Sequence, residues 1–164
     1  MLINNAGINI IKEFGDVDEA DYDRLMDINL KAPYFLSKAA AKVMKAQKKG
    51  SILNIASIWS VISKAQRSLY TSSKSGLAGM TRSLAAELAP FGISVNSLSP
   101  GFILTDLTQE SLSEKERTDL ANEVPMGRFG SPEEMANLAY FLCSNENSFM
   151  TGQNIVSDGG FTLV

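Results

Sequence analysis

The 164-residue sequence contains no histidine and a single cysteine, Cys143. Without histidine, the chain cannot form a His/Cys zinc site or a catalytic pair that uses an imidazole base. One cysteine cannot form a disulfide within the chain, which fits a protein of the reducing cytoplasm. We therefore expect a cytoplasmic protein without a metal site.

Long apolar runs and an excess of positive charge are also lacking. No apolar run approaches the roughly 18 residues that span a bilayer, and no signal-peptide pattern follows Met1. The chain has 15 Lys and Arg residues against 18 Asp and Glu residues, a balance that disfavours nucleic-acid binding. With 45% hydrophobic residues, the composition is that of one globular domain. We expect neither a membrane nor a nucleic acid as a partner.

Short apolar runs alternate with longer segments of helical periodicity along the chain. Buried strands are expected at residues 51–55, 93–98 and 154–157, and helices at 18–48, 68–88 and from Ser131 onward. Strands separated by helices of ten or more residues are typical of a parallel sheet with helices on both faces. The predicted fold is therefore α/β, a doubly wound, Rossmann-like sheet.

The first long helix contains two breaking signals. Pro33 lies inside it, which predicts either a kink or two helices in series. The run Lys48-Lys49-Gly50 predicts its end, because cations favour the last turn of a helix and glycine favours the residue that follows.

Tyr70 and Lys74 are the first candidate for chemistry. On a helix, residues four apart share one face, so the phenol and the ammonium would lie side by side. A nearby cation lowers the pKa of a phenol, which could then exchange a proton with an alcohol near neutral pH. A solvated surface pair would have the same spacing, and the spacing alone does not decide between the two.

Three further candidates follow predicted strands, at the usual ligand edge of an α/β sheet. They are Ser57, the turn Asn4-Asn5-Ala6-Gly7, and the segment Pro100-Gly101-Phe102-Ile103-Leu104-Thr105. Each also has an ordinary explanation: a serine that caps its own turn, a tight connection, and a strand breaker followed by a loop.

Together these features resemble the classical short-chain dehydrogenase/reductase family, in the family's order and at its spacing. The resemblance extends from Met1 to Val164 and also includes Asn29, the segment from Arg128 to Glu134, and Asp158-Gly159-Gly160. It implies hydride transfer between NAD or NADP and a carbonyl or secondary alcohol, with the cofactor carrying the hydride.

The resemblance also implies residue roles. Tyr70 would be the general acid and base, and Ser57 would hydrogen-bond the substrate oxygen. Lys74 would lower the pKa of Tyr70 and hold the nicotinamide ribose, and Asn29 would hold a water that links Lys74 to solvent. The cofactor would be lined by Asn5, Ala6, Gly7, Tyr70, Lys74, Pro100, Gly101, Ile103 and Thr105.

The sequence departs from the family at its start. The family's Gly-rich pyrophosphate loop precedes the Asn-Asn-Ala-Gly turn, which here begins at Asn4, and no Gly-x-x-x-Gly-x-Gly occurs in the chain. Residues 1–164 are therefore expected to form one partial domain, the C-terminal two thirds, without strands 1–3 and without that loop. Residues 104–124 would form a lid over the substrate. Because the loop anchors the pyrophosphate, we expect the chain alone to be inactive and to bind cofactor poorly.

The substrate is expected to be a small polar molecule, a sugar, polyol or keto acid. Ile58, Trp59, Ser63, Gln66 and Phe102 could line its pocket, although Trp59 could equally be a core or interface residue.

One alternative is a 3-oxoacyl-carrier-protein reductase; such enzymes tend to carry an Arg where this chain has Phe91, although Lys48 and Lys49 remain. The sequence also leaves open an extended-type epimerase or dehydratase, and a non-catalytic fragment or interaction module. The family resemblance further implies a homo-oligomer, a dimer or tetramer, that pairs the helices at 31–48 and 70–88.

Overall fold

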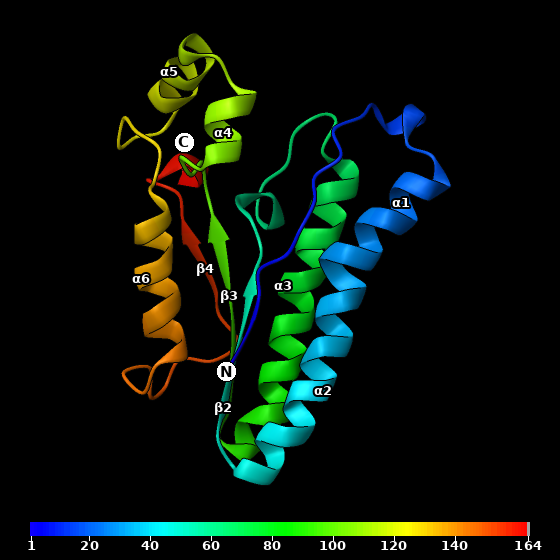
Figure 1. Cartoon of the computed structure of the whole chain (residues 1–164), viewed down its shortest axis with the longest axis vertical. Helices are drawn as coiled ribbons and strands as arrows, with labels where there is room; N and C mark the ends of the chain where they lie inside the picture. Colours follow the sequence, from blue (N-terminus) through cyan, green and yellow to red (C-terminus); the bar gives the residue numbers. More distant parts are fainter. Residues whose placement is uncertain (164) are drawn as a thin grey trace.

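A parallel sheet of four strands forms the centre of the molecule, and helices lie on both of its faces (Figure 1). The computed structural model describes residues 1–163, apart from the side chains of Leu107 and Ser111. In chain order, its main elements are β1 (Leu2–Asn4), α1 (Glu19–Met26), the π-turn η2 (Asp27–Lys31), α2 (Ala32–Gln47), β2 (Gly50–Ile55), the 3-10 turn η3 (Ile58–Ser60), α3 (Ser68–Leu88), β3 (Ile93–Pro100), α4 (Asp106–Ser111), α5 (Glu114–Glu123), α6 (Pro132–Cys143) and β4 (Asn154–Ser157). The α/β fold with a parallel sheet is therefore confirmed.

The two faces of the sheet have separate cores because successive side chains of a strand point to opposite faces. On one face Ile52 and Val95 pack against α2 and α3 through Met44 and Leu88. On the other face the core is built by Leu53 of β2, Leu98 of β3 and Leu142 of α6. The strands are in sequence order, with β1 and β4 at the edges.

The last connection of the sheet differs in hand from the first two. The strands follow one another in the same direction, and the connections from β1 to β2 and from β2 to β3 place their helices on one face. The connection from β3 to β4 places α6 on the opposite face (Figure 1). Since strand order and strand direction are unchanged, this third connection must have the opposite hand. Right-handed connections are the strong rule, so the sequence pattern did not predict this crossing.

The helix predicted at 18–48 forms as two helices joined by a π-turn. Asp18 caps α1 by accepting a hydrogen bond from the backbone N–H of Asp21 at 2.8 Å, and the π-turn η2 separates α1 from α2. Pro33 lies in the first turn of α2, where its missing N–H costs nothing. The break therefore precedes Pro33, and of the two expected outcomes the structure confirms two helices in series.

The end of α2 differs from the expectation in its glycine. Lys48, not Gly50, adopts the left-handed conformation that ends the helix, with φ of 51°. Gly50 is already the first residue of β2, and a Cβ there would lie 2.4 Å from the sulfur of Met44. This glycine is therefore needed for close packing rather than for the turn.

A ladder of buried polar side chains crosses the sheet below the predicted site. The amide of Asn4 donates to the Asn54 Oδ1 at 2.7 Å and to the Ser37 Oγ at 3.1 Å. The amide of Asn54 in turn donates to the Thr81 Oγ1 at 2.9 Å, within α3. These bonds fix β1, β2, α2 and α3 relative to one another, because a buried amide that loses its partners keeps its full desolvation cost.

The surface carries two further features. β1 is an edge strand of the sheet, and its residue Ile3 is 39% exposed. The outer face of α2 exposes Tyr34, Phe35 and Val43, whereas homo-oligomer formation through this helix stays a prediction.

Within residues 1–163, no helix has the length and apolar character that crossing a bilayer requires.

Candidate active site

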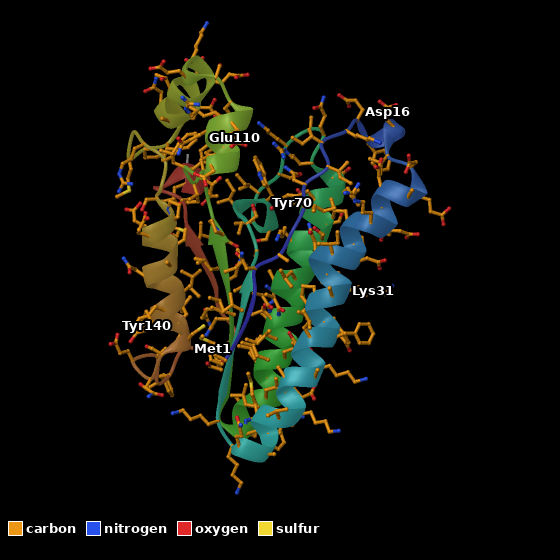
Figure 2. All side chains as sticks on the ribbon, in the orientation of Figure 1. Met1, Asp16, Lys31, Tyr70, Glu110 and Tyr140 are labelled. Atoms are coloured by element: carbon orange, nitrogen blue, oxygen red, sulfur yellow. The ribbon has the colours of Figure 1, made fainter. Side chains whose placement is uncertain are left out.

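The predicted catalytic side chains meet at the carboxyl edge of the sheet. Ser57 follows the end of β2, and Tyr70 lies in the first turn of α3, which begins beside the same edge. Figure 2 shows Tyr70 at this end of the molecule, near the ends to which the strand arrows point. Lys74, one turn further along α3, reaches back to the strand end and donates from Nζ to the backbone oxygen of Ile55 at 2.9 Å.

Lys74 is the most perturbed basic group of the site. Its side chain is buried, and burial lowers the pKa of the ammonium to about 8. Its bond to Ile55 uses one of three ammonium donors, and no other hydrogen bond joins Nζ to the described residues. Two donors therefore remain for a ligand, and no described carboxylate neutralises the charge.

Tyr70 differs from the expectation in its acidity. The sequence predicted that Lys74 lowers its pKa, but burial dominates and raises the pKa of the phenol. The Ser57 hydroxyl and the positive charge of Arg67 act in the opposite direction, and Lys74 is not among the causes. The Lys74 Nζ lies over the Tyr70 ring, 5.6 Å from its centroid. In this structure Tyr70 is therefore protonated at neutral pH and able to donate a proton.

Ser57 combines the two roles that the sequence suggested for it. Its hydroxyl accepts a hydrogen bond from the backbone N–H of Trp59 at 3.3 Å and so caps the short turn η3. The same hydroxyl also lowers the pKa of the Tyr70 phenol, against the larger effect of burial. This cap fixes the Ser57 side chain at the strand end, because its oxygen must stay within hydrogen-bonding distance of the Trp59 N–H.

Asn29 connects the turn after β1 to helix α3. Its Oδ1 accepts from the backbone N–H of Ile8 at 2.9 Å, and its Nδ2 donates to the Ile8 oxygen at 2.9 Å and to the Ser73 Oγ at 3.2 Å. The side chain is buried within the π-turn η2. Asn29 therefore holds the segment at Gly7 and Ile8 against α3, and its role in holding a water stays a prediction.

The predicted cofactor-lining turn lies directly beside Lys74. Asn5, Ala6 and Gly7 are exposed and follow the buried end of β1. A Cβ added to Gly7 would lie 3.3 Å from the Lys74 Nζ, so a larger residue would crowd the two donors that remain. Because glycine has no side chain, the backbone at Gly7 can lie close to the ammonium and still leave space for a ligand.

The second predicted cofactor segment lies at the end of β3. Pro100 pairs with Ser157, and a Cβ on Gly101 would lie 2.7 Å from the Asp158 Cα, so this glycine is required by the packing of the chain itself. Ile103 forms a bridge with Gly130. Thr105 caps α4 by accepting from the Thr108 N–H at 3.2 Å. These residues lie at the expected edge, and their contact with a cofactor stays a prediction.

Two of the residues predicted to line the substrate pocket have other neighbours. Phe102 stacks on Phe129 with ring centroids 5.7 Å apart and meets Phe161 edge-on at 5.0 Å. Trp59 is buried, with 7% of its surface exposed, and the cations Lys64 and Arg67 lie over its ring. Arg67 was missed by the sequence reasoning, although its spacing of three residues before Tyr70 could have indicated it.

A nicotinamide nucleotide fits one part of this site. The buried ammonium with two free donors, next to a glycine that leaves it accessible, suits the hydroxyl groups of a ribose. The pyrophosphate has no such support, because the chain contains no Gly-rich loop of the required pattern. No group of three or more His, Cys, Asp or Glu side chains that could hold a metal occurs in the described part of the chain.

Comparison with known proteins identifies the family. A family model described as "Enoyl-(Acyl carrier protein) reductase" matches residues 1–162. The chain belongs to the short-chain dehydrogenase/reductase family. It is 41% identical, over all its 164 residues, to the 3-oxoacyl-[acyl-carrier-protein] reductase FabG of Rickettsia felis, of which it covers 68%.

Solved structures of the family agree with this fold. A gluconate 5-dehydrogenase from Burkholderia cenocepacia, in complex with NADP and tartrate, superimposes with a TM-score of 0.93 at 30% identity. A 4-hydroxyisoleucine dehydrogenase mutant, complexed with NADH and succinate, gives 0.94 at 36% identity. Each match covers 99% of this chain, but only 65% and 68% of the two relatives. The chain thus spans about two thirds of the length of these relatives.

The burial of Lys74 predicts how its replacement changes stability. The folded-state pKa of about 8 lies below the ordinary 10.5, so the folded protein loses this proton first. The free energy of unfolding therefore rises with pH between about 8 and 10.5, and below pH 8 the full cost of the buried charge, on the order of 3 kcal/mol, remains. We expect Lys74→Met to be at least as stable as the parent at pH 7, with an advantage that shrinks by pH 10, in urea unfolding.

The matched control is Lys115→Met, which removes an exposed lysine of α5. Its free energy of unfolding should stay within about 0.5 kcal/mol of the parent at both pH values. If Lys74→Met were less stable than the parent by the same amount at pH 7 and pH 10, the buried charge of Lys74 would not be what lowers the free energy of unfolding of the parent.

Proposed function

We propose that this chain carries the catalytic residues of an NAD(P)-dependent oxidoreductase that acts on a carbonyl or secondary alcohol of a small polar molecule, such as a sugar, polyol or keto acid. The observation that carries the proposal is the meeting of Ser57, Tyr70 and a buried Lys74 at one edge of the sheet. A bound nicotinamide supplies or accepts the hydride. The protein then needs to hold the substrate oxygen and to move one proton.

Each side chain has a definite task in this proposal. Ser57 donates a hydrogen bond to the substrate oxygen from a position fixed by its bond with the Trp59 N–H. Tyr70, protonated at neutral pH, donates its phenolic proton to that oxygen during reduction and takes it back during oxidation. Lys74 directs its two free donors toward the ribose of the cofactor.

A small polar substrate is supported by two of the structural relatives. Gluconate 5-dehydrogenase and 4-hydroxyisoleucine dehydrogenase are named for small, hydroxylated acids. Their structures contain NADP in one case and NADH in the other, so the comparison supports a nicotinamide cofactor without selecting between the two forms.

A 3-oxoacyl-carrier-protein reductase is the second candidate function. It is favoured by the 41% identity to FabG of Rickettsia felis. Phe91, which stands where such reductases tend to have an Arg, is 40% exposed, and the Lys45 Nζ lies 4.7 Å from its ring centroid. A basic group thus remains near this position, together with Lys48 and Lys49. Activity on acyl-carrier thioesters, without activity on free small molecules, would select this candidate.

A non-catalytic module is disfavoured by the geometry. Asn29, Ser57, Tyr70 and Lys74 come from separate parts of the sequence, and the fold brings Asn29 to α3 through Ser73 and Lys74 to the end of β2. A purely structural module has no need for an ammonium that is buried without a counter-charge, because such a group lowers stability.

Replacement of Tyr70 tests the proposed reaction. Tyr70→Phe keeps the ring and removes the proton, so kcat in the full-length protein should fall by about two to four orders of magnitude with the fold intact. The measurement is cofactor oxidation followed by absorbance with a panel of sugars, polyols and keto acids. Tyr140→Phe, at a residue 69% exposed on α6, is the control and should leave turnover unchanged. Equal turnover of Tyr70→Phe and the parent would remove Tyr70 from the mechanism.

Cofactor binding by the isolated 164 residues is expected to be weak. The ribose end has Lys74, but the chain offers no Gly-rich loop at a helix N-terminus for the pyrophosphate. Calorimetric titration with NADH and NADPH should therefore give a millimolar dissociation constant and no turnover. Micromolar binding would contradict the expectation and show that the pyrophosphate is held by other residues.

A further inference from the structure

A cation without a counter-ion lies beside the proposed catalytic pair. Arg67 is the residue directly before α3, and its positive charge acts on the Tyr70 phenol. The guanidinium is half-buried and forms no hydrogen bond or ion pair with the side chains or backbone of the described residues. Its Nε is fully buried without any partner. Because an unpaired buried donor costs free energy, a group of this kind needs an explanation.

The surroundings of Arg67 are positive as well. Lys64 and Arg67 lie over the same ring, with the Lys64 Nζ 5.7 Å and the Arg67 Cζ 5.5 Å from the centroid of Trp59. Helix α3 begins without a side-chain cap and without an acidic residue in its first turn, so its positive end is not compensated. Glu13 is the nearby acid, and its carboxylate accepts a hydrogen bond from the Gln66 side chain at 2.6 Å instead of pairing with Arg67.

The backbone holds Arg67 in this position at some cost. Gln66, directly before it, has a φ of 66°, a left-handed conformation that a residue with a side chain rarely adopts. The bond from Gln66 to Glu13 holds this conformation by linking the loop to the segment before α1. Strain of this kind is kept where the surrounding structure fixes a functional geometry.

We infer that Arg67 is a specificity-determining residue that binds the carboxylate of the substrate while Ser57 and Tyr70 hold its reacting oxygen. The inference rests on the proposed oxidoreductase function and narrows its substrate class to hydroxy acids and oxo acids. A guanidinium presents its N–H groups in one plane, and that geometry matches the two oxygens of a carboxylate. Arg67 directly precedes α3, and its positive charge acts on the phenol of Tyr70 in the first turn of that helix.

The single tryptophan makes this binding measurable without turnover. Trp59 is the only tryptophan of the chain, and the guanidinium lies over its ring. A carboxylate seated on Arg67 should therefore change the fluorescence of Trp59. D-Gluconate and D-sorbitol form a matched pair of probes, because they differ in a terminal carboxylate against a terminal alcohol. We expect a saturable change with gluconate and none with sorbitol at equal ionic strength.

Three variants assign the binding to the guanidinium. Arg67→Gln should weaken gluconate binding at least about tenfold, since charge-assisted hydrogen bonds are lost. The affinity of Arg67→Lys for gluconate should lie between those of Arg67→Gln and the parent, because lysine keeps the positive charge but lacks the planar set of N–H donors of a guanidinium. Arg82→Gln, at an exposed arginine of the same helix, should bind like the parent. Circular dichroism confirms that each variant is folded.

The outcomes separate this inference from the proposed function. Equal responses to gluconate and sorbitol, or an unchanged affinity in Arg67→Gln, overturn the inference. A response to inorganic phosphate but not to gluconate overturns the assignment of a carboxylate. If gluconate binds through Arg67 but the full-length protein transfers no hydride to or from any hydroxy acid or oxo acid, the proposed function fails. If hydride transfer occurs while Arg67→Gln leaves both binding and KM unchanged, the inference alone fails.

Discussion

The buried ammonium of Lys74 is the constraint on which the rest of the site depends. Nothing in the described part of the chain neutralises it, and the backbone oxygen of Ile55 is its single partner there. Such a group reduces stability, so the fold must compensate by holding the surrounding elements firmly. The ladder from Asn4 through Asn54 to Thr81 does this by joining β1, β2 and α3 just below the site.

The same edge of the sheet also determines where the charged and polar groups of the site lie. The turn at Gly7 and the end of β2 at Ile55 leave room around the Lys74 Nζ, which suits the polar hydroxyl groups of a nucleotide. One turn earlier on α3, Tyr70 stays protonated through burial, and Arg67 contributes a second positive charge on the side of Trp59. Arg67, Tyr70 and Lys74 thus follow one another at the start of α3, and in the proposed reaction each contacts a different part of the substrate or cofactor.

Local patterns predicted most of the fold, because short apolar runs and helical periodicity report burial directly. The range 68–88 coincides with α3, and Ser131 caps α6 with Glu134 as its sequence indicated. Three features escaped prediction for physical reasons. The π-turn before Pro33 and the left-handed Lys48 depend on how α2 packs, and the hand of the last connection depends on which face α6 covers.

The candidate site could be predicted in position but not in its electrostatics. Residue spacing indicated Tyr70 and Lys74, and the family resemblance added Ser57, whereas the pKa of Tyr70 depends on burial, which neither reveals. The position of Arg67, three residues before Tyr70, can be read from the sequence, whereas its lack of a partner depends on how the surrounding side chains are placed.

The protonation of Lys74 gives the most direct test of this account. With 13C-labelled lysine, the chemical shift of each Cε can be followed by NMR from about pH 6 to about pH 12, a range that brackets the ordinary lysine pKa of about 10.4. Lys74→Met identifies the resonance of residue 74. The account predicts one lysine that titrates near pH 8, well before the others. If Lys74 titrated together with the exposed lysines, its ammonium would be solvated or paired, and the proposed site would lose its basis.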